Sequence, residues 1–193
     1  MSHAYSTDTF SLAPESVPTS FDSAEAFDVF YQNLPSTDNS KMLSAVSGST
    51  RDGWAIYLLQ HVLERCDFTR LQFLTGKRHR YNFEHEYGSF SRISVIDPAE
   101  LAEVIAELEQ LLVMLKDNAD IVYDADEVGV FSDGEVELAL ERDYVSANPA
   151  YDPRVAGDEG QSADYLFVLL RSILVVLKNA KSAGMAVIHL LRI

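Results

Sequence analysis

Carboxylates and a hydroxyl recur at regular spacing between residues 124 and 135. Asp124 and Asp126 stand at the first and third positions of this segment, Gly129 at the sixth, Ser132 at the ninth and Glu135 at the twelfth. Calcium takes about six to eight oxygen ligands, and a glycine permits the sharp turn that folds a loop around the ion. This spacing predicts a Ca²⁺ site with Asp124, Asp126, Ser132 and Glu135 as side-chain ligands.

The same twelve residues resemble the EF-hand calcium loop. Val130 would offer its backbone carbonyl at the seventh position, but Val128 stands at the fifth, where an oxygen ligand belongs. Binding should therefore be weak, and the chain has no second loop of this kind. The alternative is an acidic turn within an acidic segment, and we favour that alternative because short motifs often mislead.

The acidic segment itself, residues 117–164, holds most of the charge of the chain. It contains 14 Asp and Glu against two Arg, a net charge of −12 out of −15. Such segregation predicts a non-enzymatic interaction protein that binds a basic partner, in the manner of bacterial immunity proteins. The carboxylates expected to contact the partner are those of Asp120, Asp124, Asp126, Glu127, Asp133, Glu137 and Asp143.

Histidines and glutamates cluster between residues 79 and 86. His79, Glu84, His85 and Glu86 could act as general acids and bases if the fold brought them into one pocket. A small hydrolase that uses this region is our least favoured function, and a polar connector is the alternative. His61 and Glu64, one helical turn apart, are too few ligands for a zinc site, which needs about three from the protein.

Two further groups have structural interpretations. The basic residues Lys77, Arg78 and Arg80 could grip an anion, but we expect them to balance the acidic segment within the same molecule. His189 alternates with apolar residues in the last strand, which is typical of a core histidine with its hydrogen bonds satisfied.

Composition excludes several classes of function. A net charge of −15 argues against binding to nucleic acid or to anionic lipid. Cys66 is the only cysteine, so no intramolecular disulfide can form. The first 20 residues lack the features of a secretion signal, and the apolar stretch 165–177 is interrupted by Arg171 and too short to span a bilayer. We therefore expect a cytoplasmic protein, with homo-oligomers possible through the apolar helix.

Hydrophobic periodicity predicts an α+β fold with about five helices packed on a small sheet that includes the C-terminal strand. The helices are expected near residues 22–34, 52–66, 67–76, 98–117 and 162–180, and the strands near 90–95 and 185–193. The last strand is apolar on both faces, so we expect it at the centre of its sheet. Residues 135–144 fit either a strand or a helix. The predicted organisation is a flexible N-terminal arm at 1–20 and one α+β domain at 21–193, with a polar, Ser-rich connection at 36–50.

Short motifs between residues 50 and 193 resemble those of the YfbM-like bacterial proteins of unknown function. They are Leu71–Gly76 (LQFLTG), Tyr87-Gly88 before Arg92, Asp97–Leu101 (DPAEL), and Leu169–Ala180 followed by Gly184–Ile188 (GMAVI). The aromatic-proline loop at Tyr151–Pro153 also has a counterpart. The resemblance implies a small α+β fold and transfers no active-site residue.

Overall fold

The computed structural model describes residues 5–33, 42–50, 54–85, 89–117 and 162–192. The strands are β1 (Tyr5–Leu12), β2 (Met42–Thr50), β3 (Tyr81–Glu84), β4 (Phe90–Ile96) and β5 (Ala186–Arg192). The α-helices are α1 (Ala24–Asn33), α2 (Trp54–Arg65), α3 (Leu101–Asp117) and α6 (Ser162–Ala183), and the 3₁₀ turns are η1 (Pro14–Ser16) and η4 (Arg70–Thr75). The predicted α+β class is confirmed.

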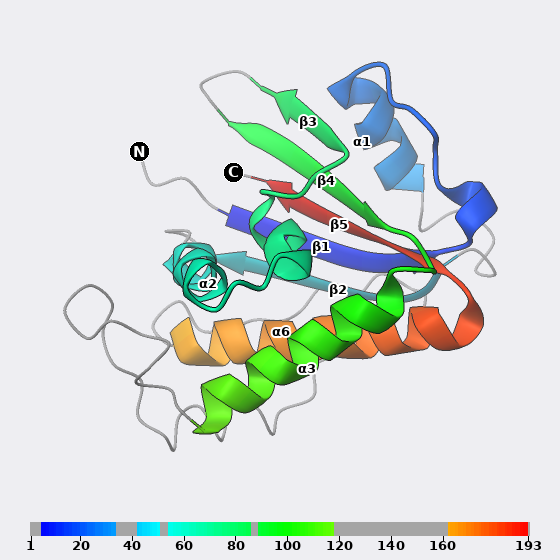
Figure 1. Ribbon diagram of the computed structural model, residues 1–193. Coiled ribbons are helices and arrows are strands. Elements are labelled where there is room, and N and C mark those ends of the chain that lie inside the picture. Colours follow the sequence, from blue (N-terminus) through cyan, green and yellow to red (C-terminus); the bar gives the residue numbers. More distant parts are fainter. Residues whose placement is uncertain (1–4, 34–41, 51–53, 86–88, 118–161, 193) are drawn as a thin grey trace.

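The described strands form one antiparallel sheet in the order β2-β1-β5-β4-β3. The C-terminal strand β5 lies at its centre, between β1 and β4 (Figure 1). Six of the seven residues of β5 are buried, so the expectation of a central strand that is apolar on both faces is confirmed.

Helices cover both faces of the sheet, and each face has its own core. On one face α2, η4, α3 and α6 pack together over the strands, and on the other lies α1, the α-helix of the described residues on that side (Figure 1). The helix-rich face is filled by aliphatic side chains such as Leu108 and Ile173. The core on the α1 face combines aliphatic side chains of the sheet, such as Ile93 and Ile188, with aromatic rings. Phe10 and Phe27 each form a tilted pair with Tyr31, and Phe27 stacks with Phe83.

The expectation of a flexible arm over residues 1–20 is wrong for residues 5–12. Residues 5–12 form β1, which is hydrogen-bonded to β2 on one side and to β5 on the other. Phe10 and Leu12 point into the α1 core, while Thr7 and Thr9 are buried on the other face. Sequence reasoning missed the strand because its inward side chains on one face are small and polar, which hides the alternation.

The polar connection expected at 36–50 is also wrong over its second half. Residues 42–50 form the edge strand β2, paired with β1 from Tyr5↔Thr50 to Leu12↔Met42. Its Ser-rich sequence carries a weak strand signal, and the pairing with β1 decides the conformation. Likewise, residues 81–84 of the expected polar connector form β3, the other edge strand, against β4.

The helix boundaries follow local chemistry. Ser23 caps α1, where its hydroxyl accepts a hydrogen bond of 3.2 Å from the Ala26 amide, and the Phe21 ring packs against Phe27. Within the part of α6 whose side chains are described, the chain itself fully buries Leu170, Ile173 and Leu177. Within the described residues, no helix combines the length and the hydropathy needed to cross a bilayer.

His189 is the histidine of the core. Its Nδ1 lies 2.8 Å from the Thr9 hydroxyl, its ring meets Phe73 edge-on, and it is 1% exposed. Burial lowers the pKa of His189 to about 4, and the Leu74 backbone offsets part of that shift. Among the described residues Nε2 has no hydrogen-bond partner, so the ring is buried as predicted but only half satisfied.

The protonation of His189 should make the fold acid-sensitive. Between the unfolded pKa, near 6.5, and the folded pKa, about 4, the unfolded chain binds a proton that the folded chain rejects. Stability should therefore fall as the pH is lowered through this window, by up to about 3 kcal/mol. Urea unfolding at several pH values would measure this, and His189→Asn should flatten the slope between pH 6.5 and 4. An equal slope in both proteins would contradict the prediction.

Gly76 and Gly184 both end helical segments with positive φ, +68° and +67°. A Cβ at Gly184 would meet open space, whereas one at Gly76 would lie 3.0 Å from Leu191 Cδ2 and 2.7 Å from Arg92 Cδ. We expect Gly184→Ala to cost about 1–2 kcal/mol from backbone strain alone. Gly76→Ala should cost at least about 1 kcal/mol more, because the buried Leu191 must also shift. Chemical denaturation of the pair tests this, and equal losses would contradict it.

Candidate functional site

The residues predicted to bind calcium or a basic partner lie outside the described residues. They are Asp120, Asp124, Asp126, Glu127, Ser132, Asp133, Glu135, Glu137 and Asp143. Both functions of this segment stay predictions. Within the part of the chain that the structure describes, no three His, Cys, Asp or Glu side chains come together as a metal site would require.

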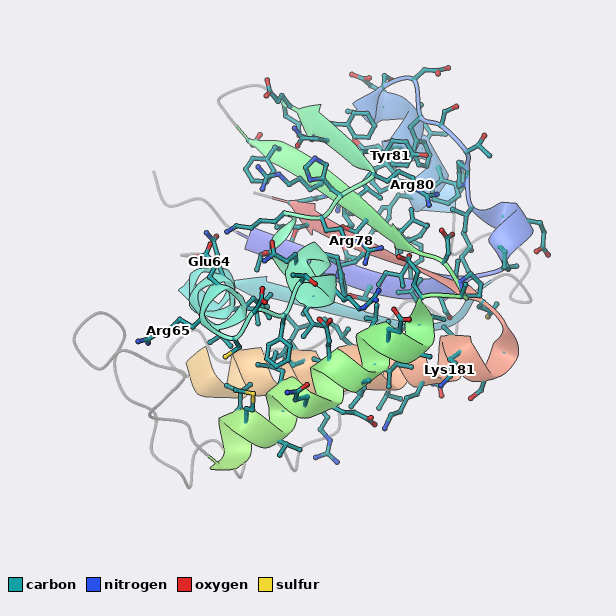
Figure 2. All side chains as sticks on the ribbon, viewed as in Figure 1. Glu64, Arg65, Arg78, Arg80, Tyr81 and Lys181 are labelled. Atoms are coloured by element: carbon teal, nitrogen blue, oxygen red, sulfur yellow. The ribbon has the colours of Figure 1, made fainter. Side chains whose placement is uncertain are left out.

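The basic residues between η4 and β3 are paired with carboxylates of neighbouring helices. Lys77 binds Glu64 on α2, and Arg78 binds Glu100 at the start of α3. Arg80 lies 3.4 Å from the Asp97 carboxylate. Figure 2 shows Glu64 on α2 and Arg78 and Arg80 in the segment that leads from η4 to β3. These cations therefore balance acidic residues of the described body.

The structure does not bring the predicted acid–base residues together. His79 lies before β3, where its Nδ1 is 2.7 Å from the Gly76 carbonyl oxygen, and His85 follows β3. The four residues of β3 span roughly 10 Å between them. Glu84 is exposed, and Glu86 lies outside the described residues. Among the described members of this group, His85 lines a pocket.

That pocket lies at one end of the sheet, on the α1 face. Its volume is about 430 Å³. It opens to solvent and is lined by residues of α1, β4, β5 and the connection between β3 and β4. These residues are Asp28, Tyr31, Gln32, His85, Ser89, Phe90, Ser91 and Arg192. Strand alternation sets this composition, because Arg192 and Ser91 are direct partners in the β4–β5 ladder and face α1.

Arg192 is the central cation of the pocket. Its guanidinium lies over the Tyr31 ring, 4.5 Å from the centroid. One nitrogen lies 3.7 Å from Asp8 Oδ2, and another lies 3.7 Å from Asp28 Oδ1. At that separation neither contact is a hydrogen bond, so both act through charge alone and leave the N–H donors of these nitrogens available.

A hydroxyl–imidazole pair forms the wall opposite α1. His85 Nε2 lies 2.8 Å from Ser91 Oγ, and the His85 amide donates a 2.8 Å hydrogen bond to the Ser89 carbonyl. A base and a hydroxyl at this distance are the pair that nucleophilic catalysis needs. Ser91 is only 4% exposed, however, which restricts the approach of a substrate to its oxygen.

Glu25 adds negative charge near this wall. Its pKa is lowered, first by a hydrogen bond from its own backbone amide, then by the Ser23 hydroxyl, with a smaller contribution from the charge of His85. The pocket thus combines one guanidinium, nearby carboxylates, hydrogen-bonding groups and the ring of Tyr31. Polar groups placed in this way suit recognition of a small polar ligand.

Sequence reasoning identified His85 and missed the other polar residues of the pocket. Asp8 lies in the segment predicted to be a flexible arm, Asp28 in the helix predicted near 22–34, and Arg192 in the predicted C-terminal strand. The one available signal was Arg192, a charged residue that follows six apolar or aromatic side chains in β5. Its carboxylate partners come from β1 and α1, so their proximity depends on the fold.

Comparison with known proteins identifies no relative. No protein-family model, no curated protein and no solved structure matches the chain. The resemblance to YfbM-like proteins therefore stays a prediction.

The two carboxylates beside Arg192 should differ in coupling although their distances are equal. The side chain of Asp8 is 9% exposed and that of Asp28 is 47% exposed. Because solvent screens an exposed pair, double-mutant cycles with Arg192→Gln should give about 1 kcal/mol of coupling for Asp8→Asn. Asp28→Asn should give less than about 0.5 kcal/mol. Chemical denaturation measures both cycles, and a coupling as strong for Asp28 as for Asp8 would contradict this account.

Proposed function

We propose that this protein is a non-enzymatic interaction module that recognises a basic partner through its acidic segment, residues 117–164. The observation that carries the proposal is the distribution of charge. The acidic segment has a net charge of −12, whereas the other residues hold 16 acidic and 13 basic side chains, a net charge of −3. A nearly balanced body thus carries one strongly negative segment.

The ion pairs of the described body support this reading. Six of its basic side chains, Arg70, Lys77, Arg78, Arg80, Lys178 and Arg192, have carboxylate partners within the same body. These partners come from α1, α2, α3, β1 and the approach to α3. These six positive charges are therefore matched by carboxylates of the body itself, and most of the net negative charge, −12 of −15, resides in the acidic segment.

The two ends of the acidic segment are attached close together on the described body, which also favours the proposal. The segment connects the end of α3, at Asp117, to the start of α6, at Ser162. Both of these helix ends lie at the same end of the helix-rich layer (Figure 1). The two attachment points are therefore held together by the packing of α3 against α6.

Charge concentrated in this way acts mainly on the encounter between partners. Attraction between opposite charges raises association rates by about tenfold to a thousandfold, and salt suppresses the gain. The Debye length falls from about 30 Å at 0.01 M salt to about 8 Å at 0.15 M. Binding to the basic partner should therefore weaken steeply over this range of salt.

A matched pair of charge variants tests the role of the acidic segment. The first variant neutralises Asp120, Glu127, Glu137 and Asp143, which are not predicted calcium ligands. The second neutralises Glu15, Asp22, Asp67 and Glu84, which are exposed in the body. Both variants raise the formal net charge from −15 to −11. We expect the first to bind a fluorescent 20-residue polylysine at least about tenfold more weakly at low salt, and the second to lose much less.

Fluorescence anisotropy at low and physiological salt measures the binding of each protein. Equal losses in the two variants would mean that net charge alone attracts the probe, which would overturn the assignment to residues 117–164. Absence of binding by the unaltered protein at low salt would overturn the proposal as a whole.

A further inference from the structure

The pocket at the end of the sheet combines opposite charges in a way that ordinary solvated surfaces do not. Arg192 and Asp28 both line it, so one positive and one negative side chain face the same small volume. We propose that this pocket binds a small zwitterion of the α-amino acid type, with the ligand carboxylate on Arg192 and the ligand ammonium on Asp28. This site is separate from the acidic segment.

The guanidinium of Arg192 is prepared for a carboxylate. Its position is set by the Tyr31 ring on one side and by the charges of Asp8 and Asp28 at its nitrogens. The contacts of Arg192 with Asp8 and Asp28 are 3.7 Å long, so they are not hydrogen bonds. A ligand carboxylate can therefore accept hydrogen bonds from these N–H groups without displacing a bond to Asp8 or Asp28. Two parallel bonds from guanidinium to carboxylate are the strong arrangement for such an anion.

The carboxylate of Asp28 supplies the opposite charge beside it. Asp28 is half exposed, so its second oxygen can reach an ammonium group that enters from solvent. Asp8, behind the guanidinium, and Glu25, near His85, add further negative charge. A ligand with only a negative charge would be repelled by these carboxylates, and a ligand with only a positive charge would be repelled by Arg192. A zwitterion can place its carboxylate on Arg192 and its ammonium on Asp28.

The remaining walls can hold an apolar side chain. The Tyr31 ring lines the pocket, and the hydrogen bond between His85 and Ser91 fixes the polar wall. Phe90 alternates with Ser91 along β4, and its ring lies against Arg92, so it adds no aromatic wall on the α1 face. A volume of about 430 Å³ lies near the lower end of the range of small-molecule pockets. The site therefore suits one amino acid or the end of a short peptide, with an apolar side chain against the Tyr31 ring.

Calorimetry with three forms of one amino acid tests the proposal. We expect phenylalanine to bind, and phenylalaninamide and N-acetylphenylalanine to bind at least about tenfold more weakly, because each has lost one of the two charges. If phenylalanine is too large or too small, the same comparison applies to whichever of the standard amino acids binds best. No binding by any of them up to about 10 mM, or equal binding by the blocked forms, would overturn the proposal.

Two variants locate the site. Asp28→Asn changes an exposed carboxylate and should abolish the preference for phenylalanine over its N-acetyl form, while the preference over the amide persists. Asp22→Asn removes one charge from the same part of the chain outside the pocket lining and should leave both preferences intact. A preference unchanged in Asp28→Asn would show that binding occurs elsewhere and would overturn the assignment. Failure of this test leaves the acidic-segment experiment unaffected, since the two use different residues and probes.

Discussion

The packing of β5 on both faces is the constraint on which the other elements depend. A strand at the centre of a sheet must bury both sets of alternating side chains, and all but the last residue of β5 are buried. One face of the strand requires α6 and the helices packed on it, and the other requires the aromatic core under α1. Both neighbouring strands come from distant parts of the chain, β1 from the N-terminus and β4 from the middle.

The connection from α6 to β5 shows how local chemistry serves this constraint. Gly184 adopts a left-handed conformation, and the Met185 amide donates a 2.9 Å hydrogen bond to the Ala180 carbonyl, which closes the helix. The chain then enters the sheet within two residues. η4 ends in the same way at Gly76, but there the absence of a side chain also allows close approach to Arg92 and Leu191. Gly184 is therefore required for the turn, and Gly76 for both the turn and the packing.

The pocket is a consequence of the same arrangement. Towards the end of β5 the side chains on the α1 face change from Leu190, in the core, to Arg192, which sits between strand and solvent. The neighbouring strands contribute Ser91, directly opposite Arg192, and Asp8, which lies opposite Leu190 and therefore diagonal to Arg192. α1 contributes Asp28 and Tyr31. The polar groups converge because the buried apolar residues of β5 and its neighbours end near the same edge of the α1 core. The acidic segment is independent of this site and carries its charge elsewhere in the chain.

The sequence by itself determined the helices, the central position of the last strand and the segregation of charge. Those features depend on short-range periodicity, on capping residues and on composition, all of which are local. The tertiary structure decided what β1 and β2 become, because Thr- and Ser-rich segments acquire their strand conformation from pairing with a partner. It also decided which polar residues share a pocket. Asp8 and Arg192 lie at opposite ends of the chain, and only the pairing of β1 with β5 places their charges 3.7 Å apart.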